Sequence, residues 1–135
     1  MEKVLIGSDV ILDLLFSREG VEDAAKLLSH CENRRLQGCI SSVALAAVCS
    51  EVSAAVPFPE AAEKISQLLV FLETMECSRE DMVIALNSEY PDFETSVNCT
   101  LAERCYSITA YITGRFADQQ SRKPVLSAKD FLLRL

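Results

Sequence analysis

The sequence predicts a three-layer α/β/α domain built on a short, mainly parallel sheet of four or five strands. The main observation is that short apolar runs, typical of buried strands, alternate along the chain with amphipathic segments of helical period. Strands that alternate with helices pair in parallel, because each helix returns the chain across a face of the sheet. The second observation is length: 135 residues suit one domain, 1–135, with a buried core.

The elements can be placed approximately along the chain. Residues 42–49 are small and apolar all round, which favours a buried helix. Residues 107–113 are rich in β-branched and aromatic side chains, which favours a strand. Ser78, with Asp81 three residues on, is typical of a helix start. The expected strands are 4–6, 39–41, 74–77, 107–113 and 124–126. The expected helices cover 20–33, 42–55, 57–73 and 78–88, and three more begin at residues 9, 91 and 127. A polar turn is expected at 32–38 and a loop at 114–123.

Composition and charge limit the function classes. The net charge of −7 argues against broad, nonspecific nucleic-acid binding and suits a basic protein partner. Charged or small polar residues interrupt the apolar runs well before a membrane-spanning length, so we expect no membrane association. The first residues pass directly into a strand, which leaves no room for a signal peptide. We therefore expect a cytoplasmic protein.

The cysteines and the single histidine do not predict a metal site. Six cysteines are scattered without a C-x-x-C pair, whereas metal fingers need clustered ligands. We expect them to be reduced, small apolar side chains. His30 lies at a predicted helix end and is expected at the surface.

The stretch where the first strand becomes a helix contains the main candidate site residues. In a parallel sheet, sites lie at the carboxyl ends of strands, and residues 7–9 and 113–115 occupy such positions. Asp9 and Asp13 are four residues apart, so one helix face would carry both. Magnesium-dependent chemistry is one interpretation, and a helix cap followed by a solvated aspartate is the other.

Three stretches along the chain carry a family resemblance. Residues 7–13 align with D-T-N-V-x-L-D, with Arg18 also in register, and residues 92–97 follow A-L at 85–86 and align with D-F-E-D-A-L. Residues 111–115 align with I-x-T-R-N or I-x-T-R-D, and P-V-L with a closing F-L follows. In this order the motifs resemble the PIN domain, the fold of many prokaryotic toxin ribonucleases of the VapC type, over nearly the whole chain.

The resemblance implies an RNA-cleaving site in which clustered acids hold one or two Mg²⁺ or Mn²⁺ ions. In this chain the family's acids fall on Gly7, Ala47 (or Val48 with a one-residue shift), Thr95 and Arg115 (or Gly114). None of these side chains supplies a carboxylate, and hard divalent ions need several oxygen ligands. The leading interpretation is therefore a degenerate member that keeps the fold, lacks ordinary nuclease activity and needs no cofactor.

An active endoribonuclease with a relocated acidic site is the alternative. Its catalytic residues would be Asp9, Asp118 and Asp92, and Asp9, Asp13 and Asp118 would bind Mg²⁺ or Mn²⁺. The simpler explanation makes Asp9 and Asp92 helix caps and leaves Glu94, Glu51 and Asp118 in solvent, with a local Asp13–Arg18 ion pair.

The partners depend on which interpretation holds. The resemblance implies a basic antitoxin-like protein and a homodimer, and the chain's negative charge independently favours the basic partner. RNA is expected as a partner only if the chain is active. A third possibility is an unrelated doubly wound domain that binds a small ligand at the strand ends.

Overall fold

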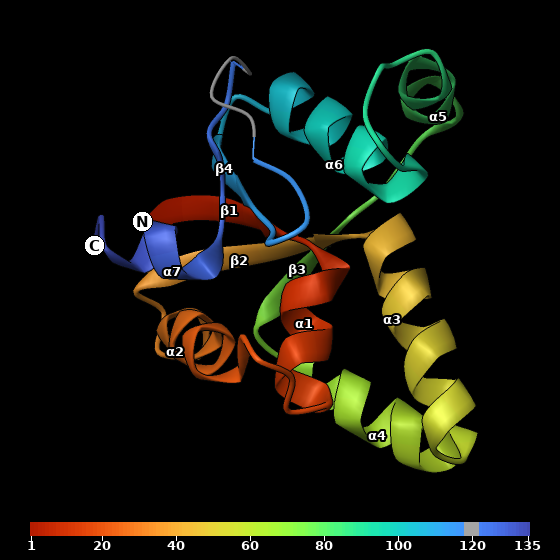
Figure 1. Ribbon diagram of the computed structural model, residues 1–135, viewed down its shortest axis with the longest axis vertical. Coiled ribbons are helices and arrows are strands. Elements are labelled where there is room, and N and C mark those ends of the chain that lie inside the picture. The colour runs from red at the N-terminus through yellow and green to blue at the C-terminus, as the bar shows by residue number, and fades with distance from the viewer. Residues whose placement is uncertain (118–121) are drawn as a thin grey trace.

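The computed structural model describes residues 1–117 and 122–135 and shows a parallel sheet with helices on both faces (Figure 1). Its strands lie in the order β3-β2-β1-β4-β5, and every neighbouring pair is parallel. This confirms the predicted fold class. The strands are β1 (Glu2–Ile6), β2 (Leu36–Ser41), β3 (Leu72–Met75), β4 (Ile108–Ile112) and β5 (Val125–Leu126). The helices are α1 (Ser8–Leu15), α2 (Val21–Glu32), α3 (Ser42–Ala55), α4 (Phe58–Leu69), α5 (Arg79–Leu86), α6 (Phe93–Arg104) and α7 (Ala128–Leu132).

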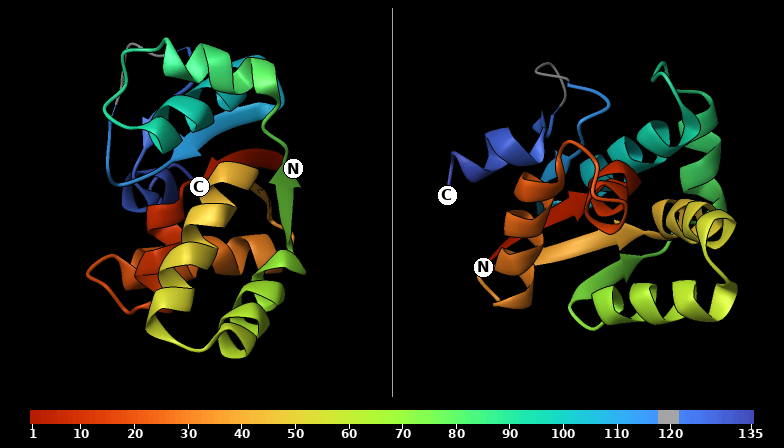
Figure 2. Two further views of the ribbon diagram at one scale, coloured as in Figure 1. Left: turned by 90° about the vertical axis from the view of Figure 1, so that its right-hand side faces the viewer. Right: turned by 60° about the horizontal axis from the view of Figure 1, so that its bottom comes forward.

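Alternate residues of the central strands point into two separate cores. Val4 and Ile6 of β1 pack with apolar side chains of α1 to α4 and α7. Leu5, between them, packs with Tyr111 and with apolar side chains of α5 and α6. Figures 1 and 2 show the two layers, with α5 and α6 on one side of the sheet and α1, α2 and α4 on the other. Burial on both faces follows from the period-2 geometry of a strand.

Several predicted boundaries are wrong: the helix expected over 57–73 ends at Leu69, the first strand begins at Glu2 rather than at residue 4, and the starts of β2 and β3 also differ. The residues predicted as a polar turn include the start of β2, which pairs with β1 from Leu36 onward. The strand predicted at 74–77 instead begins at Leu72, opposite Gly38. Leu36 and Leu72 are both buried, so tertiary pairing outweighs the polar residues beside them.

Helix starts are predicted more accurately. Helix α3 occupies the expected residues 42–55, and the side chain of Ser41 accepts a hydrogen bond from the Ala44 N–H at 3.0 Å. Helix α5 begins with the expected capping box between Ser78 and Asp81. Such caps satisfy backbone N–H groups that the first helical turn leaves free.

All six cysteines are free thiols, and three of them, Cys31, Cys39 and Cys99, are buried while the others are half-buried. Within residues 1–117 and 122–135, no helix is long and apolar enough to cross a membrane.

Candidate functional site at the carboxyl end of β1

Three elements meet where β1 ends. Gly7 links β1 to α1, and its N–H donates to the Ile112 carbonyl at the end of β4, at 2.9 Å. The segment 113–115 continues from β4 along the same edge, and the first turn of α6 approaches it through Glu94. The carboxyl ends of parallel strands therefore bring residues 7–9, 94 and 113–115 together.

The carboxylate of Asp9 is bound by the segment after β4. Its Oδ1 accepts from the Thr113 hydroxyl at 2.9 Å, and its Oδ2 accepts from the Gly114 N–H at 2.7 Å. Asp9 does not cap α1, because Gly7 occupies the N-cap position. The alternative explanation of Asp9 as a cap is thus wrong, and its carboxylate instead joins α1 to the end of β4.

Glu94 reaches the same edge from α6. Its two oxygens accept from the N–H of Ser8 at 3.0 Å and from the Ser8 hydroxyl at 2.6 Å. The guanidinium of Arg115 lies 3.7 Å from Oε1. The Glu94 side chain is only 10% exposed, so the expectation that it is solvated is wrong.

Asn98 and Tyr111 extend this polar cluster inward. The Asn98 amide donates to the Tyr111 hydroxyl at 3.1 Å and to Glu94 at 3.5 Å. Burial raises the pKa of Tyr111, and the negative charges of Glu94 and Asp9 add to this while hydrogen bonds from Asn98 and Thr113 oppose it. The phenol is therefore a neutral group between the two carboxylates at neutral pH.

Gly7 leaves no room for a side chain. A Cβ there would lie 2.7 Å from Oδ1 of Asp9, 3.2 Å from the Tyr111 hydroxyl and 3.3 Å from the Ile112 carbonyl oxygen. The carboxylate of Asp9 thus lies beside the position where an acidic side chain at residue 7 would begin.

Asp13 lies on the same helix but lines a different space. With Asp9, Asp23 and Lys129 it borders a cavity of about 140 Å³ next to α2 and α7. Burial raises the pKa of Asp13, the Asp9 charge raises it further, and the Arg18 charge opposes both. The expected Asp13–Arg18 ion pair is absent from the described residues, and the Arg18 guanidinium lies 5.2 Å from the centre of the Phe16 ring.

The remaining predicted residues do not join this cluster. Asp92 is the N-cap of α6, as the simpler explanation expects, and accepts from the N–H of Thr95 at 2.8 Å and its hydroxyl at 2.9 Å. Ala47 is half-buried on α3, and Glu51 is exposed. Asp118 lies outside the described residues. In the part of the chain that the structure describes, no three His, Cys, Asp or Glu side chains are placed to hold a metal ion.

Sequence reasoning missed Glu94, Asn98 and Tyr111. A signal for the first two was available, because Glu94 and Asn98 are four residues apart and share a helix face. No local pattern pairs Glu94 with Ser8, which is 86 residues away.

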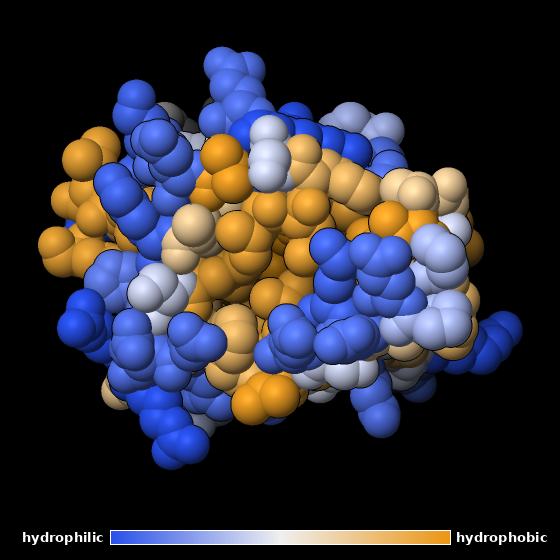
Figure 3. Space-filling view, turned by 90° about the horizontal axis from the view of Figure 1, so that it is seen from below, coloured by the Kyte–Doolittle hydropathy of each residue, from blue (hydrophilic) through white to orange (hydrophobic). Residues whose placement is uncertain are grey.

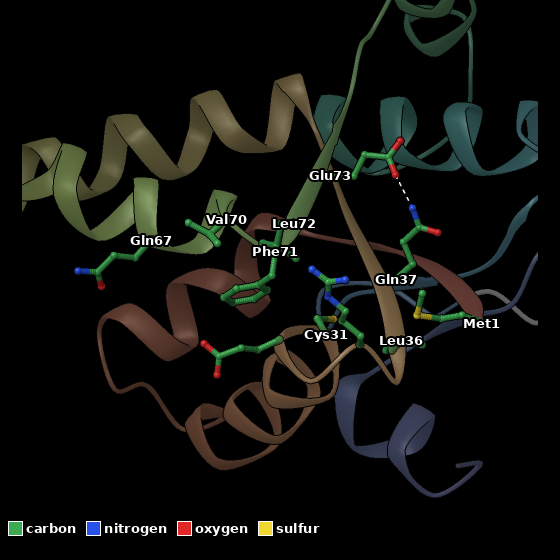
Figure 4. Close-up of a pocket in the computed structure, with 11 residues that line it drawn as sticks. Met1, Cys31, Leu36, Gln37, Gln67, Val70, Phe71, Leu72 and Glu73 are labelled. Atoms are coloured by element: carbon green, nitrogen blue, oxygen red, sulfur yellow. Dashed lines mark hydrogen bonds between the residues drawn. The ribbon is translucent and has the colours of Figure 1, made fainter.

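A second feature is a groove over α1, α2 and α4, on the face of the sheet away from α5 and α6, with hydrophobic side chains in its hollow and polar side chains around it (Figure 3). One pocket of about 490 Å³ lies between these helices, and a second of about 620 Å³ reaches the first residues of β2 and β3. The two pockets share Glu32, Gln67 and Phe71 and so form one groove. Figure 3 shows hydrophobic atoms in the hollow, and Figure 4 shows the Phe71 ring in the second pocket, with Gln37 and Glu73 hydrogen-bonded near by.

Comparison with known families gives a direct match. A sequence profile described as "PIN domain" matches residues 3–108, which include β1, α1 and α6 with Gly7, Asp9 and Glu94. The segment 113–115 lies beyond the matched residues. The comparison with curated protein sequences found no match.

Three solved structures have a similar fold. One is the crystal structure of VapBC2 from Rickettsia felis bound to a promoter DNA fragment, with a TM-score of 0.67 and 14% identity, covering 93% of this chain and 97% of that chain. Another is a toxin–antitoxin complex from Klebsiella pneumoniae, with a TM-score of 0.66, 18% identity and the same two coverages. The third is VapC20 from Mycobacterium tuberculosis, a sarcin–ricin loop cleaving toxin, with a TM-score of 0.62 and 10% identity, covering 80% of this chain and 86% of that one.

Proposed function

The chain belongs to the PIN domain family, and from this premise we propose that it is a toxin-type member without metal-dependent ribonuclease activity. Because the chain belongs to this family, the third possibility, an unrelated doubly wound domain that binds a small ligand, is excluded. The similar solved structures include a promoter-bound VapBC2, a toxin–antitoxin complex and a sarcin–ricin loop cleaving toxin. We propose that the PIN domain comprises residues 1–135.

One observation carries the proposal: the acids at the carboxyl end of β1 are bound by the chain itself. Both oxygens of Asp9 and both oxygens of Glu94 accept hydrogen bonds from backbone or hydroxyl groups. Mg²⁺ and Mn²⁺ need several oxygen ligands, and each donor directed at a carboxylate oxygen occupies one of the positions from which an ion could bind it. The donors around these acids and the positive charge of Arg115 therefore oppose the binding of a divalent ion.

A second candidate is an active, relocated ribonuclease that uses Asp9, Asp118 and Asp92, with Asp13 as a further ligand. The position of Asp9 favours it, because this carboxylate lies beside the space in which a side chain at residue 7 would begin. In that case Mg²⁺ or Mn²⁺ would be the cofactor and RNA the substrate. Asp92 weakens this candidate, since both of its oxygens bind Thr95.

RNA cleavage in the presence of Mn²⁺ or Mg²⁺ separates the two candidates. We expect the purified chain, at millimolar metal, to cleave a mixed RNA substrate no faster than the same sample in EDTA. The matched variants are Asp9→Ala and, as a control, Glu51→Ala, which removes an exposed acid from α3. Metal-dependent cleavage that Asp9→Ala abolishes and Glu51→Ala preserves would establish the relocated ribonuclease instead.

We further propose a basic antitoxin-like partner and assign it to the groove over α1, α2 and α4. Support comes from the net charge of −7 and from the apolar side chains of the groove, Leu14, Leu28, Leu68 and Phe71, beside the acids Glu32 and Glu73 and the basic Arg34 and Lys64. The expected partner segment carries apolar side chains flanked by lysine or arginine. A cytoplasmic location stays a prediction, which cell fractionation would check.

A homodimer is proposed through a different surface. Helix α5 packs on α6 and exposes four apolar side chains, Met82, Val83, Ile84 and Leu86. A helix with such an outer face is typical of an interface. We expect sedimentation to show a dimer that Leu86→Glu converts to a monomer, while Glu80→Ala on the same helix leaves it unchanged.

A further inference from the structure

We propose that Arg115 takes the place of a metal ion at the carboxyl end of β1 by supplying positive charge from within the chain. The inference rests on the proposed function, since it explains how this edge keeps its acids without a metal. It concerns the residue on which the family's last acid falls, and it assigns that residue a role of its own.

Geometry places the Arg115 charge beside Glu94. Its Nη1 lies 3.7 Å from Oε1 of Glu94. This separation exceeds a hydrogen bond, so the interaction is one of charge rather than of fixed donor geometry. The Glu94 side chain is 10% exposed and the Arg115 side chain 41%. Arg115 therefore lies between the carboxylate and solvent.

The segment 113–115 contributes hydrogen bonds to the second acid, Asp9. The Arg115 N–H donates to the Thr113 hydroxyl at 3.2 Å, and that hydroxyl donates to Asp9 at 2.9 Å. The Gly114 N–H donates to Asp9 directly at 2.7 Å. Three consecutive residues thus direct positive charge or hydrogen-bond donors toward the two acids, which is the electrostatic task of a cation at this edge.

An unpartnered acceptor marks the inner end of the same cluster. Among the buried side-chain atoms of the described residues, Oδ1 of Asn98 has no hydrogen-bond partner. The amide nitrogen of the same side chain binds Tyr111 and Glu94, so this oxygen belongs to the cluster. Buried polar atoms are nearly always paired. This acceptor without a donor belongs to the same side chain whose amide nitrogen contacts Glu94, so the cluster has one acceptor more than the described residues satisfy.

The charge of Arg115 then determines whether a divalent ion can enter. A dication near Glu94 would meet the guanidinium at short range, and this repulsion opposes binding. Replacing the guanidinium with a shorter, uncharged amide should leave the Glu94 carboxylate available as an oxygen ligand. The unmodified chain should therefore exclude Mn²⁺, and Arg115→Gln should admit it.

Mn²⁺ itself is the probe, measured by electron paramagnetic resonance without RNA. We expect Arg115→Gln to bind Mn²⁺ at least about tenfold more tightly than the unmodified chain. The gain should disappear in the double variant Arg115→Gln with Glu94→Gln. Arg104→Gln is the matched control, since it removes an arginine from a carboxylate elsewhere in the fold. Thermal unfolding with and without Mn²⁺ gives a second readout, because a ligand of the folded state raises the midpoint.

Equal Mn²⁺ affinity in Arg115→Gln and the unmodified chain would overturn the inference, as would an equal gain in Arg104→Gln. Neither result bears on RNA cleavage by the unmodified chain, which tests the proposed function separately. Metal-dependent RNA cleavage by the unmodified chain would overturn the proposed function and this inference together, whereas equal Mn²⁺ affinity of the two chains without cleavage would overturn the inference alone.

Discussion

Two carboxylates in this fold have the same kinds of partner but different surroundings. Asp81 is bound by the Ser78 N–H and by Arg104, and Glu94 is bound by the Ser8 N–H and hydroxyl and faces Arg115. Asp81 joins α5 to α6 at the periphery, whereas Glu94 lies at the carboxyl end of β1, where the family resemblance places its metal. The comparison separates a structural ion pair from a remodelled site.

The arginines show the difference most clearly. Arg104 makes two short contacts with Asp81, 2.9 Å from Nε to Oδ1 and 3.1 Å from Nη2 to Oδ2, which is the paired geometry of a fixed ion pair. Arg115 makes one contact of 3.7 Å with Glu94. Arg104 thus holds Asp81 in a fixed geometry. Glu94 is held instead by its hydrogen bonds from Ser8, and Arg115 contributes only a nearby positive charge.

The largest expected effect is that of Glu94→Ala. It leaves the buried N–H and hydroxyl of Ser8 without acceptors, and each unsatisfied donor is costly. We expect the free energy of unfolding in urea to fall by about 3 kcal/mol. Glu103→Ala, which removes an exposed acid from the same helix, should change it by less than about 0.5 kcal/mol. Similar values for the two variants would contradict the close packing of Glu94 against Ser8.

Asp81→Ala should follow, with a loss of about 2 kcal/mol at neutral pH from the capping box and the ion pair. Burial alone would raise the pKa of Asp81, but hydrogen bonds from Ser78 and the Arg104 charge together hold this pKa below its usual 3.8. A lowered pKa contributes stability above 3.8 that is lost as the pH falls through the native value.

The difference between the unmodified chain and Asp81→Ala should therefore shrink in acid. Urea unfolding in steps from neutral pH to below 3.8 measures it. Glu80→Ala, an exposed acid in the same helical turn, is the control. A difference that grows in acid would mean that Asp81 is not held in its charged form.

Gly7→Ala tests how tightly the carboxyl end of β1 is filled. The added methyl group would lie within 3.3 Å of the Ile112 carbonyl oxygen and the Tyr111 hydroxyl, and closer still to Asp9. We expect a loss of about 1–2 kcal/mol in unfolding free energy. Gly114→Ala is the matched control, because its nearest contact, 3.4 Å to Asp9, is an ordinary one. Equal stability of the two variants would show that Asp9 can move aside.

The smallest effects separate the two arginines. Arg104→Gln should lower the unfolding free energy by about 1 kcal/mol, because Asp81, 3% exposed, keeps its charge without its fixed partner. Arg115→Gln should cost less than about 0.5 kcal/mol, since its single long contact is open to solvent screening. Thermal and urea unfolding of both variants, side by side, measure the difference. A larger loss for Arg115→Gln would make it the structural residue of the two.

Local patterns predicted much of this fold. The capping box at Ser78, the bounds of the helix over 42–55 and the alternation of strands and helices all follow from residues close together in the chain, whereas the expected burial of that helix is wrong, because only Ala44, Val48 and Val52 are buried. The order of family motifs supplied the fold family, which the profile match confirms.

The site was predicted only in part, because some of its residues are far apart in the sequence. The sequence located Gly7, Asp9 and Arg115 at strand ends, where the structure places them together. It did not show that Glu94 binds Ser8, because two segments 86 residues apart meet only after the sheet has formed. Nor could it show whether the acids are bound by the chain or left free, since that depends on side-chain packing.

The central claim is that the chain, and not a divalent ion, satisfies Asp9 and Glu94. A crystal of the unmodified protein soaked in Mn²⁺, with anomalous scattering measured near the manganese edge, tests it most directly. We predict no manganese peak at the carboxyl end of β1, with Ser8 still bound to Glu94 and Arg115 still facing it. A manganese peak in contact with the carboxylate of Asp9 or Glu94 would contradict the claim.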